Sequence, residues 1–303
     1  MNWFMIALVA PILWAATNHI DKYLINKYFR NGGVGSLIIF SSLIGIFVLP
    51  FILIIHPAVF SINPILALLI IANGSLYVLG LLPYLYALAE DEASIVVPLF
   101  QTIPVFSYVL AFFVLGERLA SIQIVASLLI ILGAITLSLD LNQKKIKFKK
   151  KVFWLMFLAS FLIALNGLIF KYVAIQENFW TTSFWEYIGF AVLSIILLLF
   201  VRSYREQFLL VVKNNKRAVL GWNTTNEVLN IIAKIIMNFA TLLAPLALVW
   251  VVNGFQPFFV LFFGIIITLF SPHFSKENLL KKHLAQKVIA ILIMFIGVYL
   301  LNV

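Results

Sequence analysis

Long apolar segments recur along the whole chain, and they constrain its fold more than any other feature. An α-helix needs about 20 consecutive, mostly apolar residues to cross the hydrocarbon of a bilayer. The sequence offers ten such segments. Their expected bounds are 3–21, 34–55, 63–88, 93–115, 121–139, 152–174, 180–201, 216–242, 245–270 and 285–302. We therefore predict an all-α integral membrane protein with ten transmembrane helices.

Composition excludes the main alternative, a water-soluble domain. Hydrophobic residues make up 64% of the chain and charged residues 11%, whereas soluble proteins hold about 25% charged residues. The chain has no cysteine, which excludes disulfides and thiolate chemistry. In a membrane protein, a net charge of +10 reflects basic loops, so we expect no nucleic-acid partner.

The basic residues indicate how the chain is oriented. Of 21 Lys and Arg, 18 lie in or beside the odd-numbered connections between the predicted helices, and only Arg118, Lys171 and Lys234 lie elsewhere. This alternation favours an even number of spans. Because basic loops stay in the cytoplasm, both termini are expected on the other side of a membrane, which we take to be a bacterial inner (plasma) membrane.

The two halves of the chain resemble each other. We expect a first five-helix repeat at 1–141, a basic linker at 142–151 and a second repeat at 152–303. Six features recur in the same order: Lys22-Tyr23 and Lys171-Tyr172, Ile44-Gly45 and Ile188-Gly189, Asn73 and Asn226, Tyr86-Ala87 and Phe239-Ala240, Pro104 and Pro257, Gly133 and Gly297. Since five is odd, the second copy enters the membrane inverted, as is typical of secondary transporters.

Three motifs in the first half carry a family resemblance. They are ALAEDEAS at 87–94, PLFQTIP at 98–104 and LGER at 115–118, followed by Gly133. Here the sequence resembles an EamA domain of the drug/metabolite transporter superfamily. The resemblance implies a ten-helix secondary transporter with a central cavity, and it leaves the substrate open. The second half departs from the pattern, with Leu269-Phe270 in place of Gly116-Glu117.

The eighth predicted helix carries a polar stripe. Its members are Asn223, Glu227, Asn230, Lys234, Asn238 and Thr241. Spacings of three and four residues place them on one helical face, where contact with lipid would be costly. We expect the stripe to line a cavity and bind substrate, and its Glu, Lys and Asn side chains favour a polar or zwitterionic solute. The alternative is that the charges neutralise one another and the asparagines hold helices together.

Candidate binding residues also lie on three other helices. In the third, Asn73, Tyr77 and Tyr84 share one face, although both tyrosines could serve packing alone. The fourth and ninth place polar residues beside helix breakers, with Gln101 between two prolines and with Asn253 and Gln256 before Pro257. Paired interruptions of this kind point to a binding site at the repeat interface.

Glu186 lies well inside the seventh predicted helix. A carboxylate surrounded by hydrocarbon favours its neutral form, which suits proton coupling, so Glu186 and Glu227 are the coupling candidates. Glu186 could instead bind a cationic substrate or pair with Lys234 or Lys171. We expect Lys22 and Lys171 to extend toward the membrane interface, and Glu117-Arg118 to form the solvated edge of a short hairpin.

These features favour a secondary active transporter that moves a small polar metabolite or drug-like solute by alternating access. No GxxxxGK, HExxH or GxSxG motif occurs, so we predict no enzymatic activity, cofactor or metal. A lipid-handling flippase or an integral membrane enzyme is the alternative. The expected partners are a small-molecule substrate and membrane lipid, and the sequence leaves a homodimer open.

Overall fold

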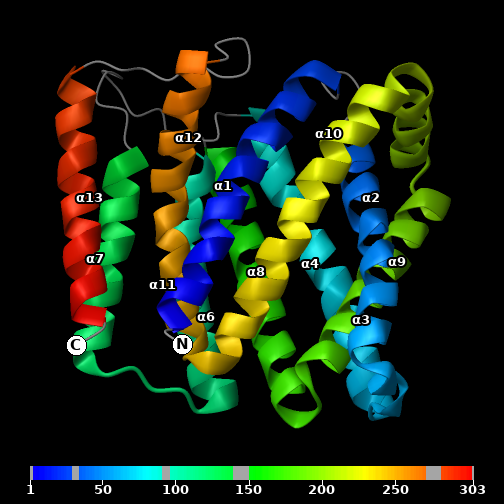
Figure 1. Ribbon diagram of the computed structural model, residues 1–303, viewed down its shortest axis with the longest axis horizontal. Coiled ribbons are helices and arrows are strands. Elements are labelled where there is room, and N and C mark those ends of the chain that lie inside the picture. The colour runs from blue at the N-terminus through cyan, green and yellow to red at the C-terminus, as the bar shows by residue number, and fades with distance from the viewer. Residues whose placement is uncertain (1–2, 29–33, 91–95, 139–149, 271–280, 302–303) are drawn as a thin grey trace.

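The computed structural model describes residues 3–28, 34–90, 96–138, 150–270 and 281–301, and every regular element within them is a helix (Figure 1). The first half contains α1 (Trp3–Tyr28), α2 (Val34–Ile44), η1 (Gly45–Val48), α3 (Leu49–Ile55), η2 (Pro57–Ser61), α4 (Pro64–Glu90), η3 (Val97–Thr102), α6 (Ile103–Leu115) and α7 (Ser121–Ser138). The second half contains α8 (Lys150–Gln176), α9 (Phe179–Phe200), α10 (Arg202–Leu243), α11 (Leu246–Val252), η4 (Asn253–Phe255), α12 (Gln256–Phe270) and α13 (Lys281–Leu301).

Seven stretches of the described chain are long and apolar enough to cross a membrane. They are Trp3–Ile25, Leu37–Ile55, Pro64–Glu90, Lys150–Gln176, Phe179–Phe200, Leu220–Leu243 and Leu246–Phe270. The predicted all-helical membrane architecture is thus confirmed. Three further apolar helices are shorter, at Leu99–Leu115, Ser121–Thr136 and Val288–Leu300, so the count of ten spans stays a prediction.

The observed boundaries differ from the predicted ones in two ways. Helix α10 begins at Arg202 rather than at residue 216, because residues 202–217 contain neither Gly nor Pro and the helix continues past its apolar part. Helix α1 likewise continues to Tyr28 rather than ending at residue 21. The second predicted helix is interrupted by the 3₁₀ turn η1, whereas the turns η3 and η4 lie beside the helix breakers that the sequence places in the fourth and ninth predicted helices. Hydropathy does not register such breaks, because the residues on both sides of them are equally apolar.

The first helix of each half packs against helices of the other half. Helix α1 packs against α10 and α12, while α8, at the same place in the second half, packs against α4 and α6. Helices α7 and α13 pack against each other at one side of the bundle (Figure 1). A Cβ atom at Gly133 would lie 2.9 Å from the carbonyl oxygen of Ala290, and one at Gly297 would lie 2.9 Å from that of Ala126. Glycine at both places thus allows the two helices to approach closely.

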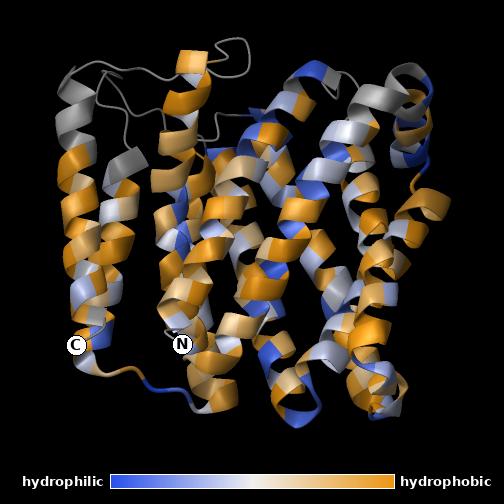
Figure 2. Ribbon diagram, viewed as in Figure 1, coloured by the Kyte–Doolittle hydropathy of each residue, from blue (hydrophilic) through white to orange (hydrophobic). Residues whose placement is uncertain are grey.

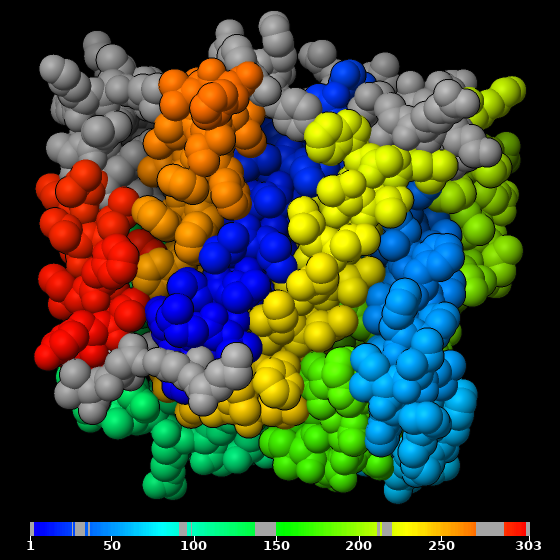
Figure 3. Space-filling view, viewed as in Figure 1, coloured from blue at the N-terminus to red at the C-terminus, as the bar shows by residue number. Residues whose placement is uncertain are grey.

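The outward surface of the bundle is apolar. Phe113, Phe200 and Phe270 each expose about four-fifths of their side chains, and Figure 2 shows hydrophobic residues along the outlying helices α7 and α13. Figure 3 shows α1 packed obliquely between α12 and α10 on one face. Lipid tails are the solvent that suits such a surface.

The first residues of α1 and the last of α13 lie at the same end of the bundle (Figure 1). We call this the terminal end. The opposite end carries the described basic residues Lys27, Lys151 and Arg202, and we call it the basic end. Most of the predicted linker, residues 142–149, lies outside the described residues.

Candidate functional site

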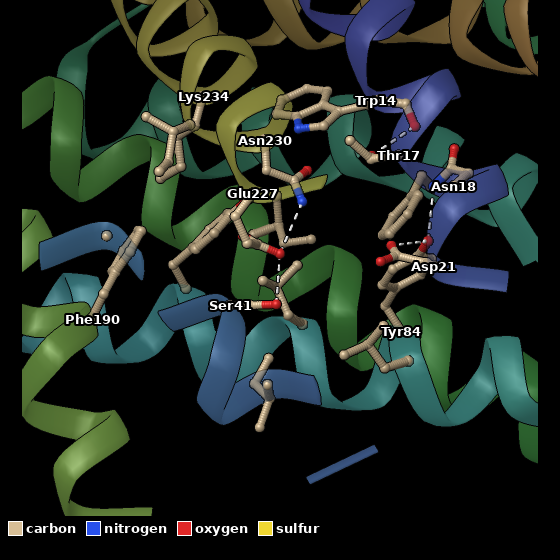
Figure 4. A pocket seen from close by; sticks show the side chains of 18 of the residues that line it. Trp14, Thr17, Asn18, Asp21, Ser41, Tyr84, Phe190, Glu227, Asn230 and Lys234 are labelled. Carbon is tan, nitrogen blue, oxygen red and sulfur yellow. Dashed lines mark hydrogen bonds between the residues drawn. The ribbon is translucent and has the colours of Figure 1, made fainter. Parts of the chain in front are cut away.

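A cavity of about 100 Å³ lies between helices of both halves (Figure 4). Its polar and charged lining residues are Thr17, Asn18 and Asp21 on α1, Ser41 on α2, Glu227, Asn230 and Lys234 on α10, and Asn253 and Gln256 around η4. Its aromatic lining residues are Trp14, Tyr77, Tyr84, Phe100, Tyr187, Phe190 and Trp250.

Seven of the twelve predicted binding residues lie on this wall: Tyr77, Tyr84, Glu227, Asn230, Lys234, Asn253 and Gln256. The other five are buried in the packing around it: Asn73, Gln101, Glu186, Asn223 and Asn238. The α10 stripe does turn inward, since Asn223, Glu227 and Lys234 are all buried. Only its middle reaches the cavity, because the helix is much longer than the space.

Two carboxylates face the cavity from different helices (Figure 4). Asp21 of α1 accepts a hydrogen bond from Asn226 Nδ2 at 2.7 Å and one from the Tyr84 hydroxyl at 3.4 Å. Glu227 of α10 accepts one from the Ser41 hydroxyl at 2.6 Å. Among the described residues, neither carboxylate has a lysine or arginine partner.

Lys234 and Glu186 form an ion pair beside the cavity. The Lys234 ammonium lies 3.3 Å from Glu186 Oε1 and 4.1 Å from the centre of the Tyr77 ring. Glu186 is fully buried, and it also accepts hydrogen bonds from Asn166 Nδ2 at 2.9 Å and Asn238 Nδ2 at 3.1 Å. Of the alternatives left open for Glu186, the structure therefore has the pair with Lys234.

A chain of hydrogen bonds connects the two halves beside Asp21. Gln256 Nε2 donates to Asn18 Oδ1 at 2.7 Å, and Asn18 Nδ2 donates to the Tyr84 hydroxyl oxygen at 2.8 Å. The Tyr84 hydroxyl in turn donates to Asp21. Helices α12, α1 and α4 are thereby joined through polar side chains, so the Asp21 carboxylate belongs to a hydrogen-bond network that includes both halves.

Stacked aromatic rings form much of the remaining wall. The rings of Trp14 and Trp250 are nearly parallel with centroids 6.0 Å apart, and those of Tyr77 and Phe190 are 5.2 Å apart. The indole nitrogen of Trp250 and the hydroxyl of Tyr187 are buried and have no hydrogen-bond partner among the described residues. The wall therefore presents mainly aromatic faces between its polar side chains.

At the terminal end, a polar contact joins helix α8 to two connections between helices. Lys171 of α8 pairs with the Glu117 carboxylate and donates to the Ala244 carbonyl at 2.8 Å. Glu117 also accepts from the backbone N–H of Leu246, at the start of α11, at 2.7 Å. We call this contact, formed by Glu117, Lys171 and the 244–246 turn, the terminal clasp.

The contacts of the terminal clasp show that two predictions, on Lys171 and Glu117, were wrong. Lys171 does not extend to the interface but is buried, and Glu117 is not solvated, because each satisfies the other. Lys22 likewise donates to the Leu88 carbonyl at 2.9 Å. The physical reason is that an apolar bundle offers each lysine a nearby backbone carbonyl, which competes with water for the ammonium.

Sequence reasoning missed Asp21, because the first helix was expected to end there and an acidic residue at a helix end suggests solvent. In fact α1 continues to Tyr28. The spacing of Thr17, Asn18 and Asp21 is the signal that could have identified it, since residues three and four apart share a face. Trp14, Ser41, Tyr187 and Phe190 were also missed, and their residue types alone give no signal in so aromatic a sequence.

Comparison with known proteins identifies one family. Residues 1–139 match the EamA-like transporter family, which confirms the family resemblance drawn from the motifs at 87–118. Among solved structures, one crystal structure superposes with a TM-score of 0.66 over 98% of this chain and 94% of that chain, at 14% sequence identity. This likeness concerns the fold alone. No curated protein sequence matches the chain.

Proposed function

Because residues 1–139 of this membrane protein match the EamA-like transporter family, we propose that it is a secondary active transporter of a small polar metabolite or drug-like solute. The observation that carries the proposal is the cavity, whose polar walls come from helices of both halves. Polar groups inside a membrane protein are costly and typically mark a solute pathway.

We further propose ten spans arranged as two inverted five-helix repeats. The helix packing supports this arrangement. Helices α1 and α8 are the first of their halves, and α4 and α10 are the third, so the contact of α1 with α10 corresponds to the contact of α8 with α4. The helical breaks η3 and η4 also fall in corresponding segments, and they contact each other beside the cavity. Two such halves can exchange conformations and so expose one site alternately to each side.

The terminal clasp supports alternating access. It joins the α6–α7 connection, α8 and the α10–α11 connection, so it holds the two halves together at the terminal end. In this proposal the clasp keeps that end closed while solute enters from the basic end. The basic end faces the cytoplasm of a bacterial cell, in keeping with the positive-inside rule.

Proton coupling is the mode of energy supply that we propose. Glu227 lies on the cavity wall and has no basic partner among the residues that the structure describes, whereas Glu186 is paired with Lys234. Glu227 is therefore the stronger of the two predicted coupling residues, and Asp21 joins it as a third carboxylate that substrate and protons could share.

Reconstitution tests the transport proposal. The purified protein is first screened against a metabolite library for compounds that raise its melting temperature, since a ligand of the folded state stabilises it. Each compound that does so is then followed into proteoliposomes under an imposed pH gradient. We expect saturable accumulation that a protonophore abolishes. Turnover of a lipid or solute without net movement across the membrane would contradict the proposal.

A further inference from the structure

The cavity wall is more anionic than the sequence suggested. The polar stripe of α10 favoured a zwitterionic solute because it offers both Glu227 and Lys234. In the structure, however, the Lys234 ammonium is already paired with Glu186 at 3.3 Å and donates to Asn166 Oδ1 at 3.0 Å. A substrate carboxylate would therefore compete with a buried ion pair.

Within the described part of the chain, Asp21 and Glu227 are left as carboxylates without counter-ions. Both are buried and line the cavity, and the groups that hydrogen-bond to them are neutral: Asn226 and Tyr84 for Asp21, and Ser41 and Asn230 for Glu227. Burying a carboxylate without an opposite charge is costly. A cation in the cavity would remove that cost at both residues.

The aromatic part of the wall suits the same ligand. Cations are attracted to the faces of Trp and Tyr rings within about 6 Å. The Tyr77 ring already holds the Lys234 ammonium at 4.1 Å, so a cation in this part of the protein does find a ring face. Trp14 and Trp250 also line the cavity and add two further rings to its wall.

We propose that the cavity binds a small organic cation, an amine that is protonated at neutral pH, between the carboxylates of Asp21 and Glu227. This assignment of a substrate class rests on the proposed transport function. The ammonium is held by the carboxylates, and the carbon skeleton lies against the aromatic rings. Anions are rejected by the two carboxylates. Zwitterions are rejected because Lys234, the one basic side chain among the described lining residues, is already paired with Glu186.

Matched ligands test the proposal directly on the full-length wild-type protein. Ethylamine and phenethylamine are compared with the zwitterions alanine and phenylalanine and with the anions propionate and phenylpropionate. Binding is measured by calorimetry on the detergent-purified protein. We expect at least one amine to bind, and to bind at least about tenfold more tightly than its zwitterionic and anionic counterparts, a ratio worth about 1.4 kcal/mol.

Variants then locate the site. Asp21→Asn and Glu227→Gln keep the side-chain shape and remove the charge, and each is expected to weaken amine binding at least about tenfold. Glu227→Asp keeps the charge and should retain most of the affinity, which separates loss of charge from loss of folding. Glu206→Gln is the matched control, because Glu206 is exposed on α10 and pairs with Arg202 outside the cavity.

Several results would overturn the cation site. They are tighter binding of a zwitterion or anion, binding of neither amine, or unchanged amine affinity in both neutral variants. Flux measurements separate this failure from that of the transport proposal. Gradient-driven accumulation of a zwitterion would leave the transporter standing and remove the cation site. Amine binding that depends on the two carboxylates but is not accompanied by flux would support the cation site and contradict the transport proposal.

Discussion

At the scale of single residues, the Lys234–Glu186 pair lets us separate structure from transport. Removing only one partner of a buried ion pair leaves an uncompensated charge, which costs about 3–5 kcal/mol in proteins. We therefore expect Glu186→Gln to lower the stability of the protein by an amount in that range, measured by thermal unfolding in detergent. Since Lys234 contacts the Tyr77 ring as well, the remaining ammonium would not be fully unpaired.

The double variant Glu186→Gln/Lys234→Met is the control for this prediction. It removes both charges and should recover most of the lost stability, because the buried site no longer holds a lone ion. Loss of transport in the stable double variant would then be a functional effect. If Glu186→Gln is as stable as the wild type, the charge of Lys234 is not compensated mainly by Glu186.

Residue type and spacing predicted the polar stripe of α10, but they did not predict which of its charged side chains are paired. The inward face follows from spacings of three and four residues. Whether Lys234 is free for a substrate or paired depends on Glu186, which lies 48 positions earlier on another helix. The sequence could name Lys234 and Lys171 as possible partners of Glu186, but choosing between them requires the packing of α9 against α10.

At the scale of helices, the crossing of α4 and α9 depends on two glycines. A Cβ atom at Gly189 would lie 2.9 Å from the Cα atom of Gly74, and one at Gly74 would lie 3.0 Å from the Cα atom of Gly189. Gly189→Val is therefore expected to separate the helices and to lower stability by about 1–3 kcal/mol or more. A shift of the melting temperature measures it.

Gly221 of α10 provides the matched control, because a Cβ atom there has no neighbour within 4 Å. Gly221→Ala is expected to leave stability unchanged or to raise it by about 0.5–1 kcal/mol, since alanine is the better helix former. Equal effects at Gly189 and Gly221 would mean that close approach of α4 and α9 is not what the glycine at 189 provides.

The terminal clasp gives a second prediction about connections between helices. Glu117→Lys places two like charges together, and we expect it to destabilise the closed terminal end and to impair transport. The exchange Glu117→Lys/Lys171→Glu restores opposite charges and should recover part of the activity. Recovery will be incomplete, because a lysine at 117 cannot accept the hydrogen bond that Leu246 N–H donates to Glu117.

Uptake in proteoliposomes, with the amount of inserted protein matched between samples, checks the charge exchange. Arg118→Gln is a neighbouring control, since it removes a charge from the same connection without touching the pair of Glu117 with Lys171. Equal activity in the single and exchanged variants would show that the pairing of the two charges has no part in transport.

Among the helices, predictability followed local composition. The apolar runs located most helical segments to within a few residues, but they missed the polar ends of α1 and α10. The prolines and polar residues near Gln101 and Asn253 indicated the breaks at η3 and η4. The break at η1 lies between Gly45 and Pro50, which cannot donate the helical hydrogen bond to residue 46. This signal was missed because residues 45–48 (GIFV) are apolar. The geometry of η1 depends on contacts with α9, which lies in the other half.

At the scale of the whole molecule, the sequence repeat predicted that the two halves are related, and the packing of their helices supports this prediction. Matches such as Gly133 with Gly297 are weak as sequence, yet these two glycines lie on helices that pack against each other. What the sequence could not provide is the difference between the halves. The terminal clasp uses Glu117, and the second half has Phe270 at the matching position, so the two ends need not open with equal ease.

That difference leads to a prediction about access, which the absence of natural cysteine makes easy to test. A single cysteine at Asn230 lies on the cavity wall. With the terminal clasp closed, we expect Asn230→Cys to react with a membrane-impermeant maleimide from the basic end much faster than from the terminal end. Adding Glu117→Gln should raise the rate from the terminal end, because the clasp no longer holds that end shut.

Ser107→Cys, at a fully buried position on α6 outside the cavity, should stay unreactive throughout. If Asn230→Cys is inert from both sides, with and without the clasp, the cavity is sealed and neither transport nor uptake of an amine can proceed through it.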